Sequence, residues 1–131
     1  LAGAAWTADG AHTLLLQPQT KAEDLRLFLS EHGYQITREA LVWDRGILYP
    51  CMEAAAGQET LSLGQLYGGA KLLHDPLGEQ YIIAKIIRFQ SAVAGLNRAG
   101  GPENQEKADA LREILTALLS MREEWRHANC S

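Results

Sequence analysis

The pattern of hydrophobic and polar positions divides the chain into a first half of short apolar runs and a second half of helical periodicity. In the first half, residues 13–16 carry three consecutive leucines without polar alternation. Such a run predicts a strand buried on both faces, as in the parallel sheet of an α/β domain. Pro18 cannot donate to a sheet ladder, so the strand should end at or before Gln17. Residues 1–11 have the pattern of a helix end followed by a turn.

A helix is predicted directly after this strand, from Lys21 to about His32. Thr20 followed by Glu23 forms a capping-box pattern, which marks a helix start. Gly33 is suited to the C-terminal end, where a left-handed conformation is common. One buried stripe is predicted from the helical spacing of Ala22, Leu25, Phe28 and Leu29.

Residues 34–49 have the pattern of an antiparallel hairpin. Its turn is Asp44-Arg45-Gly46, in which Gly46 supplies the positive φ that such a turn needs. Pro50 predicts an edge, a bulge or a short break in the second strand. Residues 54–59 have the composition of a linker, and residues 61–73 that of a glycine-punctuated loop with one short helical turn.

From Pro76 onward, apolar residues recur at alternating spacings of three and four, which predicts two helices with matching seams. The segment Gly100-Gly101-Pro102 separates them. A short connection between such helices predicts an antiparallel helical hairpin of the coiled-coil type. The seams consist of Ile82, Ile86, Phe89, Val93 and Leu96, and of Leu111, Ile114, Leu118, Met121 and Trp125.

Composition is that of one ordinary globular domain, with 47% hydrophobic and 21% charged residues. No apolar run approaches the roughly 18 residues of a membrane span. Cys51 and Cys130 form no metal or redox spacing, and the four histidines show no ligand spacing, so we expect no metal site and a cytoplasmic protein with reduced thiols. Because the chain starts at Leu1, we expect a fragment or a processed chain.

Charge is spread unevenly over a net value of −4, which argues against a free-standing nucleic-acid binder. Residues 1–70 hold four Lys and Arg against eight Asp and Glu, whereas residues 71–131 hold eight against eight. Any affinity for RNA should therefore come from local patches in the second half.

Several short motifs, in consistent order, resemble the C-terminal half of the bacterial tRNA (adenine(22)-N(1))-methyltransferases. In that family a strand ending L-Q-P-N precedes a helix with the pattern L-R-x-W-L-x-x-x-G-[FWY]-x-I. A G-K-x-Y-E-I strand follows, and a [FY]-G-P-x-L-L motif precedes a coiled coil. The similar segments here are residues 16–19, 25–36, 46–51 and 67–73. Three positions depart from the family: Gln19 replaces Asn, Pro50 replaces Glu and Gly69 replaces Pro.

This resemblance implies an α/β fold: the C-terminal portion of a Rossmann-like methyltransferase sheet followed by the helical hairpin. The expected organisation is a partial Rossmann-like domain over residues 1–57, a linker over 58–75 and a two-helix coiled coil over 76–131. The implied cofactor is S-adenosylmethionine. The family's glycine-rich cofactor loop would lie upstream of Leu1, so the fragment alone should be inactive and hold no cofactor-binding residue.

The resemblance implies a parent enzyme that methylates N1 of an adenine in tRNA, with candidate catalytic residues Gln17, Pro18 and Gln19. These lie at the carboxyl end of the predicted strand, where ligands bind in open α/β sheets. Amide side chains can both donate to and accept from the edge of an extruded base, and the proline ring offers rigidity and a stacking face. The alternative is that these residues only close a strand and begin a helix.

Four further residues are candidates for RNA contact: Tyr67, Lys71, Arg88 and Arg98. The alternative interpretation is that the loop of Tyr67 and Lys71 packs on the domain and that the basic side chains are solvated or ion-paired. Two other functions stay open, namely a non-catalytic module whose hairpin binds RNA or protein, and a methyltransferase with another substrate. No membrane partner is expected.

An apolar strand with an unpaired edge invites pairing with another copy. If the strand at residues 13–16 lacks its neighbour, a homodimer or domain-swapped assembly through that edge is expected.

Overall fold

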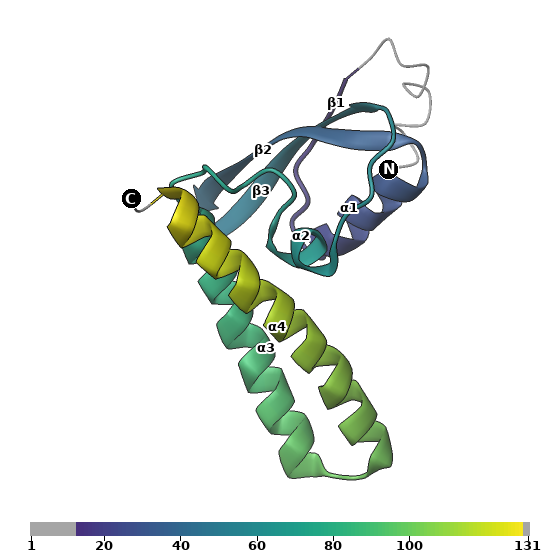
Figure 1. Ribbon diagram of the computed structural model, residues 1–131, viewed down its shortest axis with the longest axis vertical. Helices are drawn as coiled ribbons and strands as arrows, with labels where there is room; N and C mark the ends of the chain where they lie inside the picture. The colour runs from purple at the N-terminus through teal and green to yellow at the C-terminus, as the bar shows by residue number, and fades with distance from the viewer. Residues whose placement is uncertain (1–12, 130–131) are drawn as a thin grey trace.

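The computed structural model describes residues 13–129, which fold into a small sheet with helices on one side and a projecting helical hairpin (Figure 1). The helix expected within residues 1–11 lies outside the described residues. The predicted α/β class followed by a hairpin of antiparallel helices is confirmed. The elements, in order, are β1 (Leu14–Leu16), α1 (Ala22–Glu31), β2 (Tyr34–Asp44), β3 (Ile47–Ala56), α2 (Leu63–Gly68), α3 (Gly78–Ala99) and α4 (Pro102–Asn129).

The three described strands form an antiparallel sheet in the order β1-β3-β2, which corrects the expectation of a parallel, doubly buried strand at β1. β1 ends at Leu16, as Pro18 predicts, and pairs with β3 over only three positions. Leu14 points into the core and is 7% exposed, whereas Leu15 points to the other face and is 77% exposed. Among the described residues, the second face of the sheet therefore has no cover over β1.

The β2–β3 hairpin confirms the predicted turn, with positive φ at both Arg45 and Gly46. A two-residue turn of this kind matches the twist of the flanking strands. Pro50 does not interrupt β3: it pairs with Leu41 of β2, and it lies beyond the three positions where β3 pairs with β1. Pro50 lacks a backbone N–H, but at this position β3 pairs with β2 only. The missing donor therefore costs the sheet no hydrogen bond to β1. The expected linker at residues 54–59 is wrong in its first part, since β3 continues to Ala56.

A bulge in β2 decides which of its side chains enter the core. The register shifts between Ile36 and Arg38, so Thr37 is the extra residue. Before the bulge, Tyr34 and Ile36 are buried; after it, Glu39 and Leu41 are buried. Because side chains alternate along a strand, one inserted residue exchanges the two faces. The bulge thus turns the carboxylate of Glu39 inward.

The capping box predicted at Thr20 is not formed. The residue that precedes α1 is Lys21, in a left-handed conformation and without a side-chain cap. A capping box occurs instead at α2, where Ser62 accepts from the Gln65 backbone N–H at 3.2 Å and the Gln65 amide oxygen accepts from Ser62 N–H at 2.9 Å. The tight corner after Pro18 leaves Thr20 one residue too far from the helix to cap it.

The sheet and the hairpin have separate cores. Beneath the sheet, α1 packs its stripe against β1, β2 and β3, with Leu29, Ile36, Met52 and Ala54 at 1% exposure or less. In the hairpin, the predicted seams meet, and the buried residues are Ile82, Ile86, Ile114 and Leu118, with Phe89 packed against them. The predicted seam residue Trp125 lies at the base of the hairpin, where its indole N–H donates to the Asp75 carbonyl at 3.0 Å.

Candidate active-site cleft

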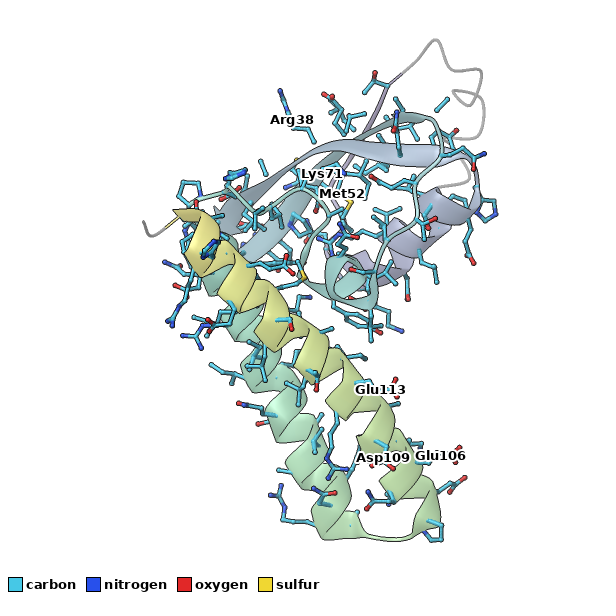
Figure 2. All side chains as sticks on the ribbon, viewed as in Figure 1. Arg38, Met52, Lys71, Glu106, Asp109 and Glu113 are labelled. Atoms are coloured by element: carbon cyan, nitrogen blue, oxygen red, sulfur yellow. The ribbon has the colours of Figure 1, made fainter. Side chains whose placement is uncertain are left out.

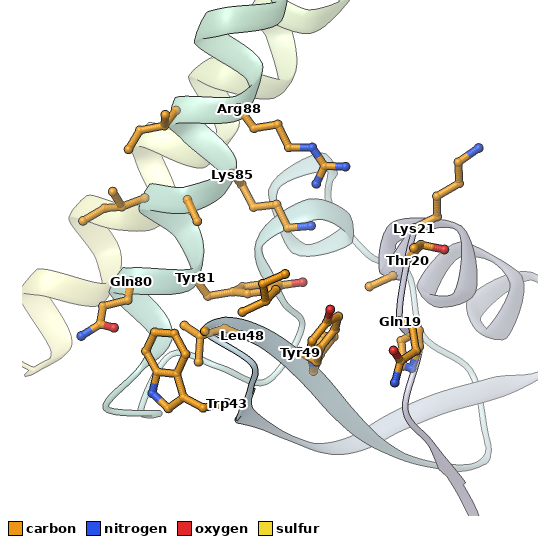
Figure 3. Close-up of a pocket in the computed structure, with 18 residues that line it drawn as sticks. Gln19, Thr20, Lys21, Trp43, Leu48, Tyr49, Gln80, Tyr81, Lys85 and Arg88 are labelled. Atoms are coloured by element: carbon orange, nitrogen blue, oxygen red, sulfur yellow. The ribbon is translucent and has the colours of Figure 1, made fainter.

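A cleft of about 550 Å³ lies where the first turns of α3 approach the β1–α1 corner and the β2–β3 turn (Figure 3). Its size is within the range of small-ligand pockets. The cleft therefore joins three parts of the chain that are distant in sequence. The described residues that line it are Pro18–Ala22 of the corner, Trp43 and Gly46–Pro50 of the β2–β3 hairpin, and Gln80, Tyr81, Ile83, Ala84, Lys85, Ile87 and Arg88 of α3.

The basic side chains of α3 extend across the cleft toward the corner. Figure 3 shows Lys85 and Arg88 reaching from the helix toward Thr20 and Lys21. The Lys85 ammonium lies 5.1 Å from the centroid of the Tyr81 ring, within cation–π range. Burial lowers the pKa of Lys85, and the nearby carboxylate of Glu23 acts in the opposite direction.

Tyr81 connects the cleft to a buried ion pair. Its hydroxyl accepts from Arg26 Nη2 at 3.3 Å, and Arg26 in turn donates to Glu39 Oε2 from Nη2 at 2.9 Å and from Nε at 3.3 Å. Arg26 Nη1 donates to the Leu66 carbonyl at 2.7 Å. Burial raises the pKa of the Tyr81 phenol, which keeps it protonated. One guanidinium therefore holds α1, β2, the end of α2 and the start of α3 together.

Two of the three predicted catalytic residues line the cleft. Pro18 and Gln19 form its wall at the corner. Gln17 is exposed and is not among the lining residues. Tyr49 of the β2–β3 hairpin lines the same cleft, and in Figure 3 its side chain is drawn between those of Leu48 and Gln19.

The four predicted RNA-contact residues lie in four different environments. Arg88 lines the cleft. Tyr67 packs into the hairpin core, edge-on to Phe89 at 5.5 Å between ring centroids, and burial raises its pKa. Lys71 forms an ion pair with Glu59 at 2.8 Å. Arg98 is exposed in the last turn of α3, roughly 15 Å along the helix from Arg88.

Sequence reasoning did not single out Trp43, Tyr49, Tyr81 or Lys85 as parts of one site. A signal was present for α3, because Tyr81, Lys85 and Arg88 are spaced four and three and so share one helix face beside the apolar seam. The sequence contains no comparable signal for Trp43 and Tyr49. Their place in the cleft depends on how the β2–β3 hairpin is oriented relative to α3.

Both glycine pairs among the described residues lie in structural positions. A Cβ on Gly68 would lie 2.9 Å from Met121 Sδ, and one on Gly69 would lie 2.3 Å from Leu72, so this glycine pair is closed by the chain's own core. Gly100 and Gly101 form the turn between α3 and α4. Over the described residues, no three His, Cys, Asp or Glu side chains gather as a metal site would require, and no helix has the length and apolar character to cross a membrane.

Comparison with known proteins assigns this arrangement to a family. The family model described as TrmK, tRNA (adenine(22)-N(1))-methyltransferase, matches residues 5–120. The chain belongs to this family. Its membership confirms the resemblance that the motifs at residues 16–19, 25–36, 46–51 and 67–73 indicate. Among curated proteins, none matches the chain.

Solved structures of TrmK proteins share the fold. Sp1610 of Streptococcus pneumoniae is 25% identical, with a TM-score of 0.73 over 92% of this chain and 53% of that chain, and it has also been crystallised with S-adenosyl-L-methionine. The B. subtilis m1A22 tRNA methyltransferase TrmK is 22% identical, with a TM-score of 0.74 over 87% and 53%. M. capricolum TrmK, solved with S-adenosyl-homocysteine, is 18% identical, with a TM-score of 0.56 over 81% and 50%. The chain thus spans about half the length of these proteins.

Proposed function

We propose that the protein to which this chain belongs is a cytoplasmic, S-adenosylmethionine-dependent methyltransferase that modifies N1 of an adenine in tRNA. The observation that carries the proposal is the family match over residues 5–120, which includes every residue lining the cleft. We infer that the cofactor is bound mainly by a part of the protein outside the described residues, since the Gly68-Gly69 pair packs against Met121 and Leu72. The chain's own contribution is the cleft at the β1–α1 corner.

The corner is suited to hold a nucleobase by its edge. The Gln19 amide can accept from the N6 amine of adenine and donate to N7, a pairing that leaves the N1 lone pair free to attack the methyl group. Pro18 holds the backbone rigid, and the ring of Tyr49, which also lines the cleft, offers a stacking surface. Leu48 and Ile83 give the cleft apolar walls. These residues would orient the base, and catalysis of this kind depends mainly on positioning.

The test is methyl transfer by the natural full-length protein. A tRNA transcript with adenosine at position 22 should accept label from S-adenosylmethionine, and the same transcript with guanosine there should not. Gln19→Ala should lower kcat/KM by about 3- to 10-fold, the value of one or two hydrogen bonds. Gln90→Ala, an exposed α3 residue outside the cleft, is the matched control. Labelling that ignores the base at position 22 would overturn the proposed substrate.

A second candidate is a non-catalytic module that binds RNA or protein through the hairpin. It is supported by the exposed apolar residues Ile87 (59%) and Leu119 (45%) on α3 and α4. Saturable tRNA binding without any methyl transfer, and without cofactor binding by calorimetry, would favour it over the enzyme.

We also propose that the free edge of β1 allows the chain to self-associate when it is expressed alone. β1 is an edge strand among the described residues, and Leu15 beside it is largely exposed. Light scattering after size exclusion should show a dimer of the 131-residue chain. Leu15→Lys should reduce dimerisation, and a stable monomer of the unmodified chain at high concentration would refute the proposal.

A further inference from the structure

We propose that the cleft binds a phosphodiester segment of the RNA beside the target base, and that Lys85, held in place by Tyr81, is the principal phosphate contact. The proposal rests on the proposed function, because it takes the RNA substrate as the anionic partner. It adds a second role to the cleft, next to that of the corner.

The lining of the cleft is cationic. The chain as a whole has 16 Asp and Glu against 12 Lys and Arg. Around the cleft this balance is reversed, because Lys21, Lys85 and Arg88 line it and none of the described lining residues is acidic. A concave site with cations alone concentrates anions, since low-dielectric walls strengthen its field.

Among the described residues, these cations have no acidic partner within ion-pair distance. Elsewhere, Lys71, Arg112 and Arg122 each lie within 4.0 Å of a carboxylate. In the described part of the chain, no carboxylate lies that close to Lys21, Lys85 or Arg88. Glu23 is near enough to act electrostatically on Lys85, but it forms no ion pair with it. The three cations are therefore available to an external anion.

The position of Lys85 is fixed by its neighbours. Tyr81 is 3% exposed, and its hydroxyl is held by Arg26, which is itself fixed by Glu39. The ring of Tyr81 then supports the ammonium of Lys85. A long side chain that is ordered before binding loses less conformational entropy when a phosphate arrives.

The shape and surroundings of the cleft favour RNA over an acidic peptide. Trp43 is 55% exposed at the rim, and Tyr49 lies inside, so flat rings adjoin the cations as in sites for unpaired nucleotides. At the far end of the helical hairpin, acidic side chains accompany the basic ones: Figure 2 shows Glu106, Asp109 and Glu113 on α4 in that region, all exposed, and Lys107 and Arg112 lie between them in sequence. RNA contact should therefore concentrate at the hairpin base.

The experiment measures tRNA affinity of the full-length protein by fluorescence anisotropy at several salt concentrations. Lys85→Gln should weaken binding and reduce the slope of log K against log salt by about 0.7–0.9, the value of one phosphate contact. Lys107→Gln makes the same charge change on α4 and should leave the slope unaltered. Equal effects of the two substitutions, or no effect of Lys85→Gln, would overturn the cleft assignment.

The role of Tyr81 is tested by two variants and one direct measurement. Tyr81→Phe keeps the ring but loses the hydrogen bond from Arg26, so it should weaken tRNA binding less than Tyr81→Leu does. Tyr81→Leu removes the ring and should reduce the salt slope as Lys85→Gln does. The ε-protons of Lys85 should show a ring-current shift in the unmodified protein by NMR, which needs no substitution. Absence of that shift, or equal tRNA binding by Tyr81→Leu and Tyr81→Phe, would refute the support of Lys85 by Tyr81.

Two further measurements separate this inference from its alternatives. Poly-glutamate should compete with tRNA equally in the unmodified protein and in Lys85→Gln. Competition that is lost in Lys85→Gln would show that the cleft is a site for an acidic protein instead. If the full-length protein transfers methyl groups but Lys85→Gln binds tRNA as tightly as the unmodified protein, the phosphate site is wrong and the proposed function stands. Lys85-dependent tRNA binding without methyl transfer would support the site and overturn the enzyme.

Discussion

Arg26 and Glu39 form an ion pair whose two side chains are both completely shielded from solvent, with 2.9 Å between Nη2 and Oε2. The carboxylate also accepts from the backbone N–H groups of Ala70 and Lys71. Every polar atom of the pair is satisfied by the surrounding fold, and no buried side-chain N or O among the described residues lacks a partner. The pair thus acts as the joint between the sheet and the helical hairpin.

Glu39→Ala should lower the free energy of unfolding by about 3–5 kcal/mol, because it leaves the Arg26 charge buried and unpaired. Urea denaturation of the full-length protein measures the change. Asp109→Ala breaks the exposed pair with Arg112 and should cost less than about 1 kcal/mol. A similar cost for the two substitutions would contradict the structural role of the buried pair.

Ser62→Ala should destabilise the protein by about 1 kcal/mol, because it removes the oxygen that caps α2. Thr20→Ala is the matched control, since Thr20 has the capping-box spacing in sequence but makes no cap in the structure. Thermal unfolding of the two variants measures the difference. Greater destabilisation by Thr20→Ala than by Ser62→Ala would show that α1 begins at Thr20 in solution.

Gly78→Ala should destabilise the start of α3. Its Cβ would lie 2.7 Å from both the Leu72 carbonyl oxygen and the Trp125 indole nitrogen, so backbone and ring have to move. Gly95→Ala, in the same helix, meets only Arg98 at 3.9 Å and should stabilise the helix by about 0.5–1 kcal/mol. Opposite signs for the two alanines in urea denaturation are the expected result, and equal signs would contradict the packing at the hairpin base.

Glu79 should give α3 and α4 a stabilising contact that acid removes. The hydrogen bond from Arg126, together with one from Arg122, lowers the pKa of Glu79 below its ordinary value against the opposing effect of burial. Because the folded pKa is the lower one, the stabilisation is complete above the unfolded pKa and disappears as the pH falls through the folded pKa. NMR titration should show the Glu79 pKa rising toward its ordinary value in Arg126→Gln.

The stability of Glu79→Gln should accordingly depend less on pH in the acid range than that of the unmodified protein. Glu106→Gln makes the same charge change on an exposed position of α4 and serves as the control. An unchanged acid dependence in Glu79→Gln, or an equal change in the control, would rule out a stabilising contact at this site.

The sequence by itself determined the elements whose causes are local. The spacing of Ile82, Ile86, Ile114 and Leu118 predicted the helical hairpin, and the glycine at position 46 predicted the turn between β2 and β3. Short motifs such as residues 16–19 also indicated the family. Such patterns can be recognised within a few residues, because helical periodicity and turn preferences are local properties of the chain.

Tertiary structure alone decided the rest. The bulge at Thr37 turns Glu39 inward, and only then can Arg26 link the sheet to Tyr81. The cleft depends on that link, because it brings Gln19 of the corner opposite Lys85 of α3. The exposure of Leu15 likewise follows from strand order rather than from its three-leucine run. Long-range pairing of this kind depends on the balance of packing over the whole chain, which no short stretch of sequence contains.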